Sequence, residues 1–317
     1  MMNSSKQNSL SCCYTNIFVI VFLLFFTFSS SELASQNFSS LFDQNYNVTW
    51  GGYHVRYFDK RRIVQLVLDQ SSGSGFVSKN KYLFGNFTMK MKLIHGDSSG
   101  TVTAYYLTTG DISGHDEVDF EFLGDKSGKF YRLQTNVFVD GEGEREERMR
   151  LWFDPTTDFH EYSILWDPNQ ILFMVDNNPI RVFKNLQKSI GVPYPSMKSM
   201  QVVASLWNGE DWATNGGKGK IKWKYSPFHV SFVGFDIQGC IQNQDEAANI
   251  NTTTSNSTSC TGNGDNYPLT GPYSPKKLIL NQSESLKHVR RYYITYSYCS
   301  DKMRFNHTPP ECFYNSF

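Results

Sequence analysis

Apolar and polar residues alternate with a period of two along most of the chain between about residues 45 and 235. The alternation is clear in "NFTMKMKLI" (86–94), "TVTAYYLT" (101–108), "RLQTNVFV" (132–139) and "HEYSILWD" (160–167). Turn-forming stretches such as "GDSSG" and "DPTTD" separate these runs, and segments with the helical period of 3.6 are nearly absent. Many short strands at this spacing are typical of an all-β fold. We therefore predict an antiparallel β-sandwich of the jelly-roll type, in which one long concave face is left open.

The pattern changes after about Asp236, where the chain becomes rich in Gly, Asn, Ser and Thr. Further on, "SESLKHVRR" favours a short helix, and "YYITYSYC" alternates again, which favours an additional edge strand. Residues 236–317 contain too few apolar residues for a core of their own. We predict that they form a small extension packed on the sandwich, which itself occupies residues 32–235.

An uncharged apolar run, Ile17 to Phe28, lies near the N-terminus and is followed by the small residues of "SSSELAS". The run is too short for a membrane-spanning helix, and its context is typical of a secretory signal peptide. We expect residues 1–31 to be the signal, with cleavage between Ser29 and Ala34. Because no later segment is apolar enough to cross a bilayer, the sequence predicts a secreted protein without a membrane partner.

The composition narrows the class of partner. The 317 residues include 30 Lys and Arg and 30 Asp and Glu, so the formal net charge is zero. Nucleic-acid-binding proteins usually carry a basic excess, so we expect no nucleic acid as partner. Aromatic residues make up 15% of the chain; packing in a β core accounts for most of them, and others could line a sugar-binding cleft. No cluster has the spacing of metal ligands, so we expect neither a metal nor a cofactor.

Cysteines and glycosylation sequons agree with secretion. Cys12 and Cys13 would leave with the signal, and four cysteines then remain, which allow three disulfide pairings. Pairing of neighbours, Cys240 with Cys260 and Cys299 with Cys312, closes the shortest loops and is the pattern that we expect. Free buried thiols are disfavoured in an oxidising compartment. Sequons are acceptors where they are exposed, and the strongest candidates are those in "NINTTTSNSTS"; the sequons start at Asn37, Asn47, Asn86, Asn251, Asn256, Asn281 and Asn306.

The stretch "HDEVDFEFLG" (115–124) places Glu117, Asp119 and Glu121 two residues apart between bulky apolar residues. On a strand such residues share one face, while the apolar residues between them point into the core. The acids must then face solvent or a cleft. A solvated acidic edge is the simpler interpretation, but like charges at this spacing repel one another. We expect His115 to support the carboxylates by a hydrogen bond rather than to act as a catalyst.

The spacing of Glu117 and Glu121 fits a pair of glycosidase carboxylates. Their Cα atoms lie about 13 Å apart on a straight strand, and side chains leaning towards each other bring the carboxyl groups to about 5 Å. That separation is expected for a retaining mechanism, whereas inversion needs a wider gap for water. One carboxyl group must be ionised and the other protonated, and the spacing does not assign these roles. Asp119 between them can hold a proton and keep the outer two distinct.

The same stretch resembles the active-site signature of the xyloglucan endotransglucosylase/hydrolases of glycoside hydrolase family 16, which usually has Ile where this chain has Val118. The resemblance runs from about residue 35 to the end. It includes "LQTNVF", "GEGEREER", "LWFDPTTDFHEYSILW", "SLWNGEDWATNGG" and the tail "YCSDKMRF". It implies a concanavalin-like jelly-roll catalytic domain within residues 32–235 and a C-terminal extension with two disulfides.

By position, the resemblance implies Glu117 as the nucleophile, Asp119 as the assisting carboxylate and Glu121 as the general acid/base. The saccharide contacts that it implies are Gln134, Thr135, Asn136, Glu144, Arg145, Glu146, Trp207, Asp211, Trp212, Gly216 and Arg304. Simpler interpretations stay open for these residues: exposed strand positions for Gln134 and Asn136, a solvated charged hairpin for 144–148, core packing for Trp207 and Trp212, and an ion pair of Arg304 with Asp301 or Glu311.

The resemblance further implies a monomeric enzyme of the plant cell wall and apoplast that needs no cofactor and whose partners are xyloglucan donor and acceptor chains. Such an enzyme cleaves internal β-1,4-glucosyl linkages of xyloglucan with retention and rejoins the glycosyl unit to another chain. The short segment between "TNVF" and "LWFDP" favours transfer over hydrolysis, and Asp125 stands where relatives often carry a sequon. A mainly hydrolytic endo-β-glucanase, a transferase acting on cellulose or mixed-linkage glucan, and a lectin-like sandwich without turnover are the alternatives.

Overall fold

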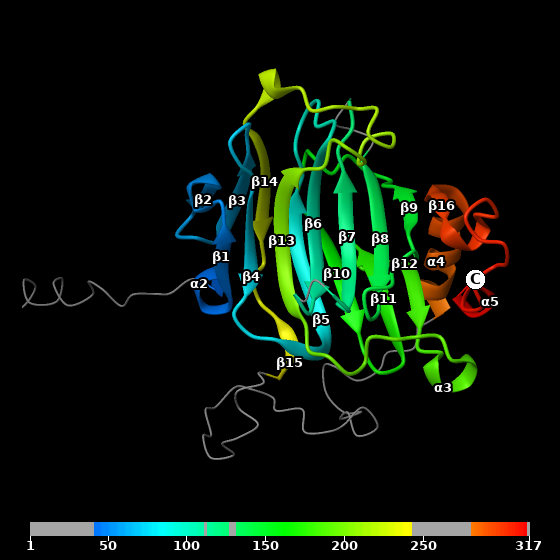
Figure 1. Ribbon diagram of the computed structural model, residues 1–317. Coiled ribbons are helices and arrows are strands. Elements are labelled where there is room, and N and C mark those ends of the chain that lie inside the picture. The colour runs from blue at the N-terminus through cyan, green and yellow to red at the C-terminus, as the bar shows by residue number, and fades with distance from the viewer. Residues whose placement is uncertain (1–40, 111–112, 127–130, 243–279, 316–317) are drawn as a thin grey trace, which may run out of the picture. The chain divides into compact units, whose positions relative to one another are not determined.

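Two antiparallel β-sheets packed face to face form the protein (Figure 1). The computed structural model describes residues 41–110, 113–126, 131–242 and 280–315. Sheet A has the order β1 (Tyr46–Trp50), β4 (Ser74–Ser78), β13 (Gln201–Asn208), β6 (Thr101–Thr108), β7 (Glu117–Leu123), β8 (Arg132–Phe138), β9 (Glu147–Arg150) and β16 (Ile294–Ser297). Sheet B has the order β12 (Asn178–Lys184), β11 (Gln170–Val175), β10 (His160–Trp166), β5 (Tyr82–Lys92), β14 (Phe228–Val233), β3 (Ile63–Leu68) and β2 (Val55–Phe58), with β15 (Gln238–Ile241) also on β5. The predicted all-β sandwich is confirmed.

The core between the sheets explains the orientation of β7. Phe120 and Phe122 are fully buried. The ring of Phe122 meets that of Tyr162 on β10 edge to face at 4.7 Å, and Phe120 meets Phe173 on β11 at 5.2 Å. Aromatic pairs of this geometry add to the stabilisation from burial. Because the apolar residues of β7 are anchored in this core, its acidic residues must lie on the opposite face of sheet A.

The C-terminal extension contacts both sheets. Its strand β16 pairs with β9 and becomes the edge strand of sheet A, as the alternation in "YYITYSYC" predicts. Its helix α4 (Leu280–Tyr293) packs on the outer face of sheet B, where the fully buried Leu286 contacts Leu165, Leu172 and Val182. Figure 1 shows α4, β16 and α5 (Cys312–Asn315) together beside β9 and β12. The extension is therefore continuous with the sheet that carries the acids.

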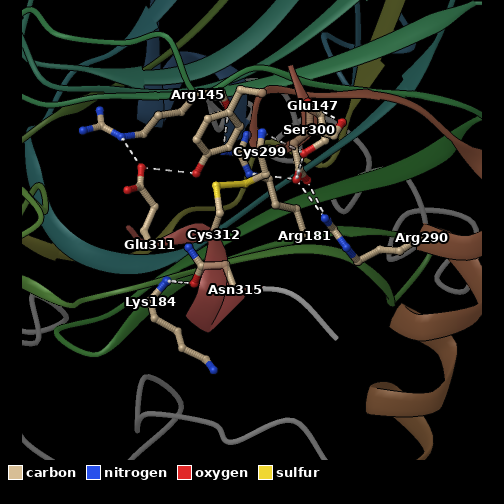
Figure 2. Close-up of a disulfide and its surroundings, with 12 residues drawn as sticks. Arg145, Glu147, Arg181, Lys184, Arg290, Cys299, Ser300, Glu311, Cys312 and Asn315 are labelled. Carbon is tan, nitrogen blue, oxygen red and sulfur yellow. Dashed lines mark hydrogen bonds and ion pairs between the residues drawn. A yellow bond between two sulfur atoms is a disulfide. The ribbon is translucent and has the colours of Figure 1, made fainter. Parts of the chain in front are cut away.

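The Cys299–Cys312 disulfide, predicted from the spacing of the cysteines, closes the end of the extension (Figure 2). Cys240 is also disulfide-bonded, but its expected partner Cys260 lies outside the described residues. The same holds for the predicted signal peptide and for the sequons at Asn37, Asn251 and Asn256. Of the other sequons, Asn47 and Asn306 are exposed, Asn86 is half-buried on β5, and Asn281 falls in the first turn of α4.

A buried ionic network joins the extension to the sandwich (Figure 2). Glu147 on β9 accepts hydrogen bonds from both terminal nitrogens of Arg290 on α4 at 2.6 and 2.8 Å, and from the hydroxyl of Ser297 at 3.0 Å. Arg181 on β12 lies 3.8 Å from the same carboxylate. Burial alone would raise the pKa of Glu147, but the hydrogen bonds from Arg290 and the charge of Arg181 outweigh it and hold that pKa below its ordinary value. The extension is thus fixed to the sandwich by charge as well as by packing.

Among the helices of the described ranges, none combines the length and the apolar character needed to span a bilayer. The remaining α-helices of the described ranges are short: α2 (Leu41–Asn45) precedes β1, and α3 (Gln187–Ile190) follows β12.

Candidate active site

Strand register gathers the predicted catalytic and binding residues on the open face of sheet A. Glu117, Asp119 and Glu121 project from β7, the central strand of this face. On β8, Asn136 pairs with Asp119 and Gln134 pairs with Glu121. Directly paired residues on one face lie within contact distance. Gln134 and Asn136 therefore lie beside the acids on the neighbouring strand.

The three carboxyl groups differ in burial. Asp119 is 3% exposed, whereas Glu117 and Glu121 are partly exposed. Burial, followed by the charge of Glu121, raises the pKa of Glu117 to about 7, and a hydrogen bond from Thr108 opposes this rise. Burial and the charges of both neighbours raise the pKa of Asp119 well above its ordinary value. The group therefore cannot carry three negative charges near neutral pH and must retain protons.

The carboxylate of Glu121 is held by a chain of hydrogen bonds from the neighbouring strands. It accepts a hydrogen bond of 2.6 Å from the side-chain nitrogen of Gln134, and the Gln134 oxygen accepts one of 2.6 Å from Nε of Arg148 on β9. Burial raises the pKa of Glu121, while the Gln134 hydrogen bond and the Arg148 charge oppose that rise. In the free protein these contacts favour a charge on Glu121 over a charge on Glu117.

Arg148 was not among the residues predicted from the sequence. It lies at the end of the charged run "EREER", and nothing in that run distinguishes it from its neighbours. Its role depends on the pairing of β9 with β8, which places Arg148 directly opposite Gln134. The alternation along β9 assigns Arg148 to one face of the strand, but only the pairing of β9 with β8 shows that this is the face of the acids.

Thr135 and Arg145 depart from the predicted saccharide contacts. The side chain of Thr135 is buried on the core side of sheet A, where its hydroxyl accepts a hydrogen bond of 2.9 Å from Arg181. The guanidinium of Arg145 donates to the carbonyls of Val137 and Glu142 and lies 3.3 Å from Glu311. The expectation that Thr135 faces the sugar is thus wrong, because successive strand residues point to opposite faces. Arg145 shapes the turn after β8.

Trp207 and Trp212 form an apolar surface beside the acids. Trp207 on β13 is in register with Val102 on β6, which is in turn in register with Leu123 at the end of β7. The two indoles lie 6.1 Å apart and are partly exposed, covering Val102, Leu123 and Ala213. They are therefore not core residues of the sandwich, and their rings reach the same open face as the carboxylates.

The remaining predicted contacts lie on two loops and the extension. Arg304 donates to both oxygens of Glu146 at 2.6 and 3.3 Å and lies 3.6 Å from Glu144, instead of pairing through its side chain with Asp301 or Glu311. On the loop after β13, Asp211 is almost fully exposed and lies 3.1 Å from Lys220. Gly216 on this loop has a φ of +63°, a conformation that favours glycine.

His115 does not use its Nδ1 to support the acids. That atom is buried and has no hydrogen-bond partner among the described residues, and the ring packs against Phe138 at 5.0 Å. Within the ranges that the structure describes, no group of three or more His, Cys, Asp or Glu side chains is arranged to hold a metal ion.

Comparison with known proteins links the fold and the site to one class of enzyme. Residues 42–225 match the family model described as "Glycosyl hydrolases family 16", and residues 265–312 match "Xyloglucan endo-transglycosylase (XET) C-terminus". The chain is 49% identical over 299 residues to xyloglucan endotransglucosylase/hydrolase protein 2 of Arabidopsis thaliana, which covers 94% of this chain and 97% of that protein. It is 44% identical over 290 residues to xyloglucan endotransglucosylase protein 6 of Diospyros kaki, covering 92% and 94%.

Solved structures show the same fold. The Crh5 transglycosylase without ligand aligns with a TM-score of 0.50 at 21% identity, covering 62% of this chain and 78% of that one. At this level of identity the likeness supports the β-sandwich and no finer statement.

Proposed function

The chain belongs to the xyloglucan endotransglucosylase/hydrolases of glycoside hydrolase family 16, and we propose that it cleaves internal β-1,4-glucosyl linkages of xyloglucan and rejoins the glycosyl unit to a second xyloglucan chain. The observation that carries the proposal is the row of three acids on the open face of β7, with Gln134 bonded to Glu121. This chemistry requires two carboxyl groups in different protonation states, and the surroundings of Glu117 and Glu121 differ in the way described above.

In the first half-reaction, the carboxylate of Glu117 attacks the anomeric carbon of a glucosyl residue. The bond from that carbon to the bridging oxygen breaks, and Glu121 donates its proton to this oxygen as the reducing-side fragment leaves. Attack requires the charge on Glu117 and the proton on Glu121, which is the reverse of the distribution that the free protein favours. A bound donor chain shifts the proton, because the bridging oxygen can only accept a hydrogen bond and therefore favours the protonated form of Glu121.

In the second half-reaction, Glu121 is a carboxylate and acts as the base. It removes the proton from the 4-hydroxyl group of an acceptor chain, whose oxygen attacks the anomeric carbon and breaks the ester bond to Glu117. With Glu117 neutral in the ester, the Gln134 hydrogen bond and the Arg148 charge stabilise the charged form of Glu121. Asp119, buried between the two and kept neutral by their charges, can donate its proton in a hydrogen bond to whichever neighbour is ionised.

Substrate binding follows from the same face. Trp207 and Trp212 offer partly exposed rings on which a glucosyl ring can stack. Gln134, Asn136, Asp211 and the backbone at Gly216 can form hydrogen bonds with sugar hydroxyls, and the pair of Glu146 and Arg304 extends the polar surface towards the extension. We include secretion in the proposal: residues 1–31 would be removed, and the mature monomer would act in the plant cell wall and apoplast.

The experiment expresses the full-length chain and uses the protein that is secreted, with xyloglucan and a fluorescent xyloglucan oligosaccharide as acceptor. Wild type is expected to incorporate label into polymer, and Glu117→Ala is expected to abolish incorporation. Parallel reactions with cellulose and mixed-linkage glucan test the substrate, and release of reducing ends without label tests a hydrolase. Incorporation by Glu117→Ala at the wild-type rate would refute the proposed site.

A further inference from the structure

Four side chains form a row across four neighbouring strands, from the C-terminal extension to the catalytic centre. Register places Tyr296 of β16 opposite Arg148 of β9, Arg148 opposite Gln134 of β8, and Gln134 opposite Glu121 of β7. The Arg148 guanidinium lies over the Tyr296 ring, 5.2 Å from its centroid. From Arg148 the row continues through two hydrogen bonds of 2.6 Å to the Glu121 carboxylate.

We propose that the C-terminal extension controls the acid/base Glu121 through this row, with Tyr296 and Arg148 as positioning residues that do not touch the reacting atoms. The inference rests on the proposed function, because it assigns a task to the proton donor of that mechanism. It also gives the extension a role in the chemistry in addition to its place at the edge of sheet A.

The first step of the argument is the orientation of the Gln134 amide. The amide oxygen only accepts hydrogen bonds and the nitrogen only donates them. Because the Arg148 Nε–H occupies the oxygen, the nitrogen must face Glu121. If Arg148 were absent, the amide could turn over and direct its oxygen at the carboxylate, which would repel it. Arg148 therefore decides whether Gln134 supports or opposes a charge on Glu121.

The second step is what holds Arg148. Its guanidinium packs on the Tyr296 ring, a cation–π contact. The hydroxyl of the neighbouring Thr295 donates to the Arg148 carbonyl at 3.2 Å, so β16 fixes both the backbone and the side chain of Arg148. On the other strand face, the adjacent Glu147 is anchored to Arg290 of α4. The position of Arg148 is thus set by the extension.

The third step is the charge that surrounds Glu121. Glu117 and Asp119 face it from its own strand, Tyr106 from β6, and Arg148 and Glu146 from β9 and the turn before it. The charge of Glu146 raises the pKa of Glu121, whereas Arg148 lowers it. Arg304 of the extension binds Glu146 with two hydrogen bonds and thereby offsets that negative charge. Tyr296 and Arg304, which both belong to the extension, therefore favour the charged form of Glu121.

The charged form is the one that removes the proton from the acceptor hydroxyl in the second half-reaction. By stabilising it, the extension favours the step in which the glycosyl unit is passed on. The row also limits how far the Glu121 pKa rises in the free enzyme, so it sets the pH at which Glu121 loses its proton there.

The test measures kcat/KM for the donor against pH. Because the free protein favours the charge on Glu121 and the proton on Glu117, the acidic limb of that profile reports the ionisation of Glu121 and the basic limb reports that of Glu117. Removing the positive charge raises the pKa of Glu121, so the donor stays protonated to higher pH. In Arg148→Met the acidic limb is expected to move to higher pH by about half a unit or more. Tyr296→Leu is expected to move it in the same direction by less, and Tyr296→Phe, which keeps the ring, to restore the wild-type limb.

Arg150→Met is the matched control. Arg150 lies two residues from Arg148 on the same face of β9 and is exposed, so its substitution removes the same charge outside the row. The limb is expected to stay where it is in wild type. Arg148→Lys keeps the charge and provides a second readout if Arg148→Met fails to fold; its limb is expected to lie between those of wild type and Arg148→Met.

The proposal would be overturned if Arg148→Met and Tyr296→Leu left the acidic limb of the kcat/KM profile at its wild-type pH. If Arg148→Met and Arg148→Lys lower kcat/KM equally at every pH, or only raise KM, Arg148 acts as a substrate contact or a structural residue. A limb that moves equally in Arg150→Met would also refute it, because the effect would then be one of general charge. Failure of the proposed function looks different: wild type itself would not transfer label to polymer.

Discussion

Replacing Glu147 by Gln tests how strongly the extension is fixed to the sandwich. Gln keeps the shape and one acceptor oxygen but removes the charge. In wild type the carboxylate is 5% exposed, accepts two hydrogen bonds from Arg290 and one from Ser297, and lies near Arg181. Arg181 is 3% exposed, so water cannot replace the lost partner. The substitution leaves a buried guanidinium without its anion.

The expected loss in the free energy of unfolding follows from that burial. Removing one partner of a buried ion pair typically costs about 3–5 kcal/mol. We expect the lower end of this range, about 3 kcal/mol, because Arg290 is 18% exposed in its side chain and regains some hydration. Arg181 also keeps its hydrogen bonds to the carbonyls of Thr135 and Arg145. A loss of this size is a large part of the total stability of a typical domain.

Urea denaturation at pH 7 measures this loss as a change in the free energy of unfolding. The pKa of Glu147 is held below its ordinary value. The carboxylate therefore contributes stability that is present above the unfolded pKa and is lost as the pH falls through the folded pKa. The gap in unfolding free energy between wild type and Glu147→Gln should accordingly shrink as the pH is lowered below about 4.

The control is Lys90→Met, which removes an exposed charge 3.9 Å from Glu161 and is expected to cost less than about 1 kcal/mol. If Glu147→Gln were as small in effect as this control, the buried network would not anchor the extension. A gap that is independent of pH would contradict the stated cause.

Three further predictions concern the core, the disulfide and the acids. Leu286→Ala empties a fully buried site under α4 and should lower the unfolding free energy by about 2–4 kcal/mol in urea; a loss below about 1 kcal/mol would show that α4 is not docked there. Replacing Cys299 and Cys312 by Ser releases a loop of sequence separation 13 and should cost about 3 kcal/mol, measured by the same titration without reductant; an unchanged midpoint would contradict it. Glu117→Gln should be more stable than wild type at pH 8, by up to about 3 kcal/mol, and similar to it at pH 4. The reason is that the folded pKa of Glu117 is raised from 4.5 to about 7, so wild type loses stability as the pH rises through that range; a difference that does not vary with pH would refute this.

The two-residue period was sufficient to predict the face of each residue in β7. Within "EVDFEFL" it assigns the acids to one side and the apolar residues to the core, and the packing of Phe120 and Phe122 confirms it. The same rule applied to residues 134–136 would have excluded Thr135 from the open face. Only the resemblance points to Thr135 as a saccharide contact, whereas the alternation predicts its face correctly.

Contacts between distant strands could not be predicted in the same way. Arg148 acts on Glu121 through Gln134 because β9, β8 and β7 are in a particular register, which is set by the turns between them and not by the local sequence. The partner of Arg304 was missed for the same reason: Glu146 is distant in the sequence, whereas Asp301 and Glu311 are near. The placement of Trp207 over Val102 and Leu123 likewise depends on the neighbours of β13.

The most direct test of the central claim identifies the residue that forms the covalent intermediate. Wild-type protein is incubated with a xyloglucan oligosaccharide that carries fluorine at C2 of the reacting glucosyl unit and a fluoride leaving group, and its peptides are analysed by mass spectrometry. Fluorine at C2 slows both half-reactions and so preserves the intermediate. The account predicts a glycosyl adduct on Glu117, formed by wild type and lost in Glu117→Ala. An adduct on Glu121, or turnover with inversion and no adduct, would contradict it.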